Sequence, residues 1–197
     1  EALVAFATPG HGDGGSAAWA DAARACPDCA NAALLRSTFL VPKWGHPIGE
    51  LRAFVETMRP TIAKVAALGP LAGAVDAVEC DERLIAGDAA GARTACGRAL
   101  RTGPSVWVLY DRALAERRLE DDAAALADCN RILELDPQFP GALVLRARLL
   151  APTPRALEAL RDLAAAVRID RLGTKPDVYR DVLSQALTTG QQAEAAG

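Results

Sequence analysis

The sequence predicts an all-α protein, a right-handed superhelix (α-solenoid) of antiparallel helix pairs. Alanine and leucine dominate a chain that is 51% hydrophobic and only 5% aromatic. Such a composition favours helices, because the β-branched and aromatic residues that favour strands are sparse. Amphipathic segments alternate with short turns, and two of the prolines that close them, Pro104 and Pro137, lie 33 residues apart. A repeat of this length indicates stacked helix pairs that bury their apolar faces against their neighbours.

The clearest unit spans residues 106–139. The segment "PSVWVLYDRALAERR" carries apolar residues at helical spacing, and "LEDDAAALADCNRILELDPQF" forms a second amphipathic pattern. The second helix is expected to stop at Pro137, because a proline ring cannot continue a helix. Two helices, a tight turn and a terminal proline resemble a tetratricopeptide (TPR) repeat. In the TPR frame, the small residues Ala113 and Ala125 fall where the two helices approach closely.

The same frame extends over the rest of the chain. Upstream, a Gly87-Asp88 turn separates two helical segments that stop at Pro104. Atypical TPR-like helices are expected over residues 16–69, and a flexible Gly-rich segment over 1–15. A TPR array is expected over residues 70–197, with units that cover about 73–105, 106–139, 140–173 and a partial 176–197.

The stretch "LVPKWGHP" places a tryptophan in the turn between two helices of the atypical part. Gly45 permits a backbone conformation that other residues resist, and so reverses the chain. Trp44 is expected to fold back and fill the groove between the helices, and an exposed binding anchor is the rival interpretation. The run "PKWG" also resembles a Pro-(Arg/Lys)-Trp-Gly-Gly turn in uncharacterised bacterial proteins with TPR-like helices, with His46 in place of the second glycine. This resemblance supports the fold and implies no activity.

Cys26 and Cys29, in "CPDC", form the closest cysteine pair in the sequence. The pair closes a helix, at the end whose dipole disfavours a thiolate, and no second pair follows nearby to complete a zinc site. The ends of a turn lie close enough for a bridge. A structural disulfide is therefore favoured over free thiols and over a redox or metal role. Such a bridge would favour a periplasmic or secreted protein over a cytoplasmic one.

The other three cysteines, Cys80, Cys96 and Cys129, fall at packing positions of the repeat frame. We expect each to be a buried thiol without chemistry.

Several classes of function receive no support from the sequence. The net charge of −3 predicts neither nucleic-acid nor membrane binding, and no apolar run approaches the roughly 18 residues that span a bilayer. The glycines of residues 10–15 fit G-x-G-x-x-G, but no second strand follows to complete a dinucleotide-binding unit. We predict no catalytic residue, no metal site and no cofactor.

The resemblance to TPR arrays implies a binding surface on the first helices of successive repeats. Their second, fifth, ninth and twelfth positions most often touch a bound peptide, and no carboxylate lies between Pro140 and Arg155. With added positive charge from Arg146 and Arg155, the surface suits an acidic or C-terminal peptide segment; the alternative is that these arginines only solvate the surface. The candidate residues are Trp107, Tyr110, Arg117, Val144, Arg148, Arg180 and Ser184.

The function predicted is therefore a non-catalytic protein–protein interaction module of bacterial type that binds a peptide or partner protein on its concave face. Two alternatives stay open. One is a redox or metal-dependent protein that uses Cys26 and Cys29. The other is an inhibitor or immunity-type protein that binds through its N-terminal or convex surface.

Overall fold

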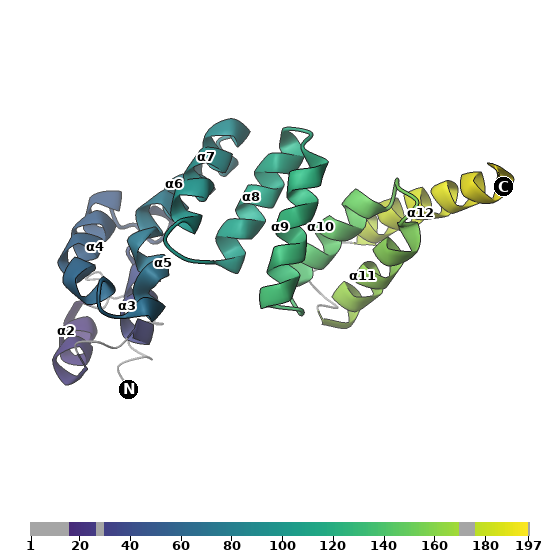
Figure 1. Ribbon diagram of the computed structural model, residues 1–197. Coiled ribbons are helices and arrows are strands. Elements are labelled where there is room, and N and C mark those ends of the chain that lie inside the picture. Colours follow the sequence, from purple (N-terminus) through teal and green to yellow (C-terminus); the bar gives the residue numbers. More distant parts are fainter. Residues whose placement is uncertain (1–15, 27–29, 170–175, 197) are drawn as a thin grey trace. The chain divides into compact units, whose positions relative to one another are not determined.

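The computed structural model describes residues 16–26, 30–169 and 176–196, and every regular element in these ranges is a helix (Figure 1). The all-α prediction is thereby confirmed. The predicted Gly-rich segment 1–15 lies outside the described residues. The helices are α2 (Ser16–Ala25), α3 (Ala30–Phe39), η1 (Pro42–Trp44), α4 (Ile48–Ile62), η2 (Ala66–Leu68), α5 (Gly69–Ala72), α6 (Ala74–Ile85), α7 (Ala89–Leu100), α8 (Val106–Arg118), α9 (Asp122–Leu135), α10 (Pro140–Leu150), α11 (Ala156–Ile169) and α12 (Pro176–Ala196).

The chain divides into two compact units. Unit 1 comprises residues 1–87 and 94–105, and unit 2 comprises residues 88–93 and 106–197. The domain boundaries placed after residues 15 and 69 stay predictions, as does the right-handed course of the superhelix. None of the described helices is both long and apolar enough to cross a membrane.

Unit 2 is built from helical hairpins with short turns. The turn between α8 and α9 passes through Glu120, which has a positive φ of 60°. The side chain of Asp121 then caps α9 by accepting a hydrogen bond of 3.2 Å from the backbone N–H of Ala124. As expected, Ala113 and Ala125 are fully buried, and their core cluster also contains Cys129, Leu145 and Leu149. Small side chains at this contact let the two helices approach closely.

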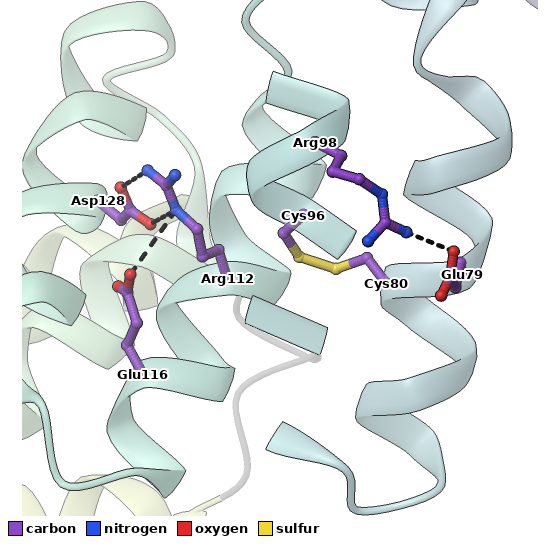
Figure 2. The surroundings of a disulfide bond; sticks show 7 residues. All are labelled: Glu79, Cys80, Cys96, Arg98, Arg112, Glu116 and Asp128. Atoms are coloured by element: carbon purple, nitrogen blue, oxygen red, sulfur yellow. Dashed lines mark hydrogen bonds and ion pairs between the residues drawn. A yellow bond between two sulfur atoms is a disulfide. The ribbon is translucent and has the colours of Figure 1, made fainter. Parts of the chain in front are cut away.

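A side-chain link joins the two helices of each of three hairpins. In unit 1, a disulfide joins the helix pair α6–α7 (Figure 2). In unit 2, a guanidinium on the first helix donates two hydrogen bonds to a carboxylate on the second, in both α8–α9 and α10–α11. The two residues of every link lie 16 positions apart in the sequence: Cys80–Cys96, Arg112–Asp128 and Arg146–Asp162.

The expectation of three unpaired thiols was wrong for Cys80 and Cys96. Both are fully buried as expected, but their Cα atoms lie 5.1 Å apart and their sulfurs are bonded, because the close helix approach brings the two positions within bridging distance. Cys129 is the buried free thiol that was expected. Cys29 lies outside the described residues, so its bridge to Cys26 stays a prediction.

The core of the N-terminal helices in unit 1 contains Ala33, Met58, Leu68 and Leu71. Trp19 of α2 packs against this core, with its ring edge-on to Phe54 of α4 at a centroid distance of 5.1 Å.

The predicted burial of Trp44 was wrong, because its side chain is 58% exposed. The chain reversal itself is present: Gly45 has a φ of +87° and donates a hydrogen bond of 2.8 Å to the carbonyl of Pro42. The short η1 turn directs the Trp44 ring outwards, where it contacts Phe39 (centroids 6.3 Å apart) and lies under the Lys43 ammonium.

Gly73 allows a close approach between α5 and the end of α7 in unit 1. A Cβ at this position would lie 2.5 Å from the hydroxyl of Thr102 and 2.8 Å from the carbonyl oxygen of Ala99. Both distances are shorter than van der Waals contact, so any side chain larger than hydrogen would push the two segments apart.

Gly73→Ala should therefore lower the free energy of unfolding by about 1–3 kcal/mol, as measured by guanidinium denaturation. Gly97→Ala on α7 is the matched control, because a Cβ there meets no atom within 4 Å. The control should be neutral or stabilising by about 0.5–1 kcal/mol, since alanine favours a helix over glycine. Equal effects of the two substitutions would contradict the close approach.

Loss of the disulfide should weaken unit 1. Cross-links that close loops of this length stabilise a protein by about 3 kcal/mol. Wild type refolded in a dithiol reductant should lose roughly that amount relative to the oxidised protein in guanidinium denaturation. The Cys80→Ala/Cys96→Ala variant should be about as stable as the reduced wild type, both with and without the reductant. A wild-type protein that is equally stable with and without reductant would refute the link.

Candidate functional site

The candidate site lies on α8 and α10 of unit 2, the first helices of two successive hairpins. We call this surface the α8–α10 face and define it by Trp107, Tyr110 and Arg117 on α8 and Val144 and Arg148 on α10. The α8 residues follow one another at intervals close to a whole number of helical turns, and so do the α10 residues. Each set therefore lies along one side of its helix.

An aromatic group occupies one end of the α8–α10 face. Trp107 is 68% exposed, and its ring meets the buried ring of Phe139 edge-on at a centroid distance of 4.9 Å. The half-buried ring of Tyr110 lies 5.4 Å from the same Phe139 ring. Tyr110 also covers Gly141, where a Cβ would come within 2.9 Å of its ring. Phe139 thus anchors two exposed or half-exposed aromatic side chains on α8.

Phe139 was not among the residues predicted for the site. It is the N-cap residue of α10 and precedes Pro140 and Gly141, so its sequence pattern resembles an ordinary turn. The signal that could have revealed it is the glycine at the second position of α10. A glycine there leaves space for rings to pack against the start of α10, and the rings of Tyr110 and Phe139 occupy this space.

Two arginines give the α8–α10 face its positive charge. Arg117 is exposed and Arg148 is half-buried, and neither forms an ion pair with another described residue. Burial raises the pKa of Tyr110 above its usual value of 10.0, and the charges of Arg148 and Arg117 act in the opposite direction. Both guanidinium groups therefore lie near enough to the phenol to influence its ionisation.

The expectation that Arg146 and Arg155 add free positive charge was wrong. Arg146 donates bonds of 2.7 Å to both carboxylate oxygens of Asp162 and a third of 2.9 Å to the amide oxygen of Asn130. Arg155 is paired with Glu158 through two bonds of 2.8 Å. The absence of carboxylates between residues 140 and 155 was misleading, because the partners come from α11 and α9.

The two predicted residues on α12 form a separate group. Arg180 is exposed and is paired with Asp177 one turn earlier, and Ser184 is exposed one turn later. Both line a shallow hollow of about 620 Å³ together with Pro152 and polar residues of α12. The residues that line this hollow include none of the five that define the α8–α10 face, so the structure does not join the seven predicted residues into one site.

A charged cluster of Arg112, Glu116 and Asp128 joins α8 to α9 within the α8–α9 hairpin (Figure 2). Arg112 donates bonds of 2.7 and 2.6 Å to Asp128, and its Nε lies 3.7 Å from a carboxylate oxygen of Glu116. Burial, followed by the charge of Asp128, raises the pKa of Glu116 to about 7. Sequence reasoning missed this cluster, since its members lie on two helices and its two bonded residues are 16 positions apart.

The described residues were also compared with what a metal site or a nucleophilic thiol requires. Among them, no group of three or more histidine, cysteine, aspartate or glutamate side chains is arranged to hold a metal ion. Burial raises the pKa of the Cys129 thiol to about 12, so this cysteine stays protonated and is a poor nucleophile.

Comparison with known proteins identifies the fold of this chain. No family model matches the chain. The tetratricopeptide repeat and J domain-containing co-chaperone DNJ1 of Cryptococcus neoformans is 35% identical over 123 residues, which cover 61% of this chain and 23% of that relative. YrrB, a TPR protein with an unusual peptide-binding site, is 20% identical with a TM-score of 0.51, covering 89% of this chain and 84% of YrrB. TTC0263, a thermophilic TPR protein of Thermus thermophilus, is 17% identical with a TM-score of 0.48 over 89% and 90%. The likeness to YrrB shows the fold, and the predicted TPR-like helical repeat is confirmed.

Proposed function

We propose that this chain, a TPR-like repeat protein, is a non-catalytic protein–protein interaction module that binds an acidic peptide segment of a partner on the α8–α10 face. The observation that carries the proposal is the combination on one surface of an exposed aromatic side chain with two guanidinium groups that lack carboxylate partners among the described residues. Trp107 and Tyr110 supply apolar contact area on a rigid helix, and Arg117 and Arg148 supply charge-assisted hydrogen bonds.

The distribution of the arginines supports an acidic partner. Arg112 and Arg146 are each held by a carboxylate inside a hairpin, so they are committed to the fold. Arg117 and Arg148 have no such partner among the described residues. Arginine beside aromatic rings is the composition typical of the energetically important part of protein interfaces.

The proteins of similar fold also support a binding role. YrrB is described as having a peptide-binding site, and the fungal relative is a co-chaperone. This chain spans 23% of that relative's length, so the relative's activity is not transferred here. What we carry over is the use of a TPR-like surface to bind a polypeptide.

The Trp44 turn is a second candidate surface, and it favours the alternative of a partner bound through the N-terminal part. Trp44 is exposed and the turn that presents it is fixed by Gly45 and Pro42. A preorganised tryptophan loses little conformational entropy when it binds. This surface would act in addition to the α8–α10 face or in place of it.

We also propose that the chain matures in an oxidising compartment such as the periplasm or the extracellular space. The Cys80–Cys96 disulfide supports this proposal, because thiols in the cytosol are kept reduced. A bacterial origin stays a prediction of the sequence.

Selection from a random peptide library displayed on phage tests the acidic-peptide proposal. Wild type should enrich segments with several aspartate or glutamate residues. Arg117→Glu/Arg148→Glu should bind the selected peptides at least about tenfold more weakly in fluorescence polarisation, because it reverses both unpaired charges. Trp107→Ala should also weaken the binding of these peptides, because it removes contact area from the face.

The matched control is Arg161→Glu/Arg168→Glu on α11, which makes the same change of charge at two exposed positions of unit 2. This variant should bind like wild type. If the control weakens binding as much as the test variant, only net charge matters and the site assignment fails. If Trp44→Ala alone abolishes binding, the N-terminal surface is the binding site.

A further inference from the structure

Glu116 lies in a position that is apolar in the neighbouring hairpin. The links Arg112–Asp128 and Arg146–Asp162 align the α8–α9 hairpin with α10–α11, and in this alignment Glu116 corresponds to Leu150. Leu150 is 2% exposed and belongs to the core, and Glu116 is 6% exposed. A carboxylate thus occupies a place suited to a leucine side chain, where the charged form is poorly solvated.

The guanidinium nearest to the Glu116 carboxylate, that of Arg112, is already paired with Asp128. Arg112 gives both of its close hydrogen bonds to Asp128 and lies 3.7 Å from Glu116. The second carboxylate oxygen of Glu116 is buried and has no hydrogen-bond partner. In the next hairpin, Arg146 has one carboxylate partner and the neutral amide of Asn130 on its other side. The cluster of Arg112, Asp128 and Glu116 therefore holds two carboxylates and only one guanidinium.

The other ionisable groups around Glu116 do not compensate for this excess. Asp128 on α9 and Asp121 in the turn both raise the pKa of Glu116, whereas the charge of Arg112 lowers it. The Cys129 thiol stays neutral at physiological pH. Arg93 of α7 lies 3.9 Å from Asp121 and so interacts with the turn more than with Glu116. The surroundings favour the protonated form of this side chain.

We propose that the protonation state of Glu116 controls the stability of the α8–α9 hairpin. The neutral carboxyl stabilises the hairpin, and loss of its proton destabilises the end of α8 that carries Arg117. The backbone connects the two. The carbonyl of Glu116 accepts bonds of 3.0 and 2.9 Å from the N–H groups of Leu119 and Asp121, and that of Arg117 accepts one of 3.1 Å from Glu120. Repulsion at the Glu116 side chain therefore acts on the turn that fixes Arg117. This inference goes beyond the proposed function and needs no bound peptide.

The sign of the pH dependence follows from the raised pKa. In the unfolded chain Glu116 has its ordinary pKa near 4.5, and in the folded chain the value is about 7. Between these values the folded state binds more protons, so the stability contributed by the neutral carboxyl is complete below pH 4.5 and is lost as the pH rises through 7. The hairpin should therefore be more stable against unfolding in mildly acidic than in mildly alkaline solution.

Carboxyl-detected NMR of ¹³C-labelled protein measures the titration directly. The Glu116 carboxyl carbon should titrate with a midpoint near 7, and in wild type the melting temperature should fall by roughly 5–10 °C between pH 5.5 and pH 8. Glu116→Gln, which keeps the shape and removes the charge, should lose most of this fall. If Glu116→Gln does not fold, Glu116→Leu supplies the residue found at the equivalent position and should behave in the same way.

Glu134→Gln serves as the control, because Glu134 is an exposed carboxylate on α9 that is paired with Arg131. It should keep the wild-type pH dependence. A Glu116 midpoint near 4.5, or an equal fall of the melting temperature in wild type and Glu116→Gln, would overturn the inference. Neither result would bear on whether the α8–α10 face binds a peptide.

Discussion

Three described hairpins of this chain depend on a side-chain link between their first and second helices. The two residues of each link are 16 positions apart, although one link is covalent and the other two are ionic. The spacing is constant because each hairpin has similar helix lengths and a short turn, so that the same two helical positions always face each other. Small side chains such as Ala113 and Ala125 bring the helices close at this level, and the link fixes which residues meet.

The ionic links also determine which arginines of these hairpins are already paired within the fold. A guanidinium that donates two hydrogen bonds to a buried carboxylate is unavailable to a partner, because releasing it would leave a poorly solvated charge behind. Arg112 and Arg146 are held in this way. Arg117 of α8 and Arg148 of α10 form no such pair with another described residue. The proposed binding face and the hairpin links therefore use different arginines of the same helices. In the α8–α9 hairpin, the link Arg112–Asp128 also lies beside a second buried carboxylate, that of Glu116.

Much of the fold could be predicted from the sequence, because it depends on local patterns. The helix pairs, the prolines after them and the reversed backbone at Gly45 all follow from helical periodicity and the restrictions on single residues. The partners of the side chains could not be predicted in this way. Cys80 and Cys96 were each judged by position on one helix, and Arg146 was judged by the absence of acidic neighbours in its own segment. Their partners lie one helix away, 16 residues along the chain.

The position of Trp44 shows a second limit. A large aromatic residue in a turn is compatible with burial and with exposure, and the sequence alone does not say which helix fills the adjoining groove. In the folded chain Trp19 packs against the N-terminal core and contacts Phe54, whereas Trp44 is exposed. Trp107 and Tyr110 lie at peptide-contacting positions of the repeat frame, whereas their common anchor Phe139, the last residue of the unit 106–139, does not.

A double-mutant cycle on Arg146 and Asp162 tests the central claim most directly. Guanidinium denaturation of Arg146→Met, Asp162→Leu and the double variant gives the coupling free energy of the link, separated from the effects of each substitution on its surroundings. A link that holds the hairpin predicts a coupling of at least about 1.5 kcal/mol, the range of a bidentate, half-buried arginine–carboxylate pair. A coupling below about 0.5 kcal/mol, the range of a solvated surface pair, would mean that the hairpins are held by apolar packing alone.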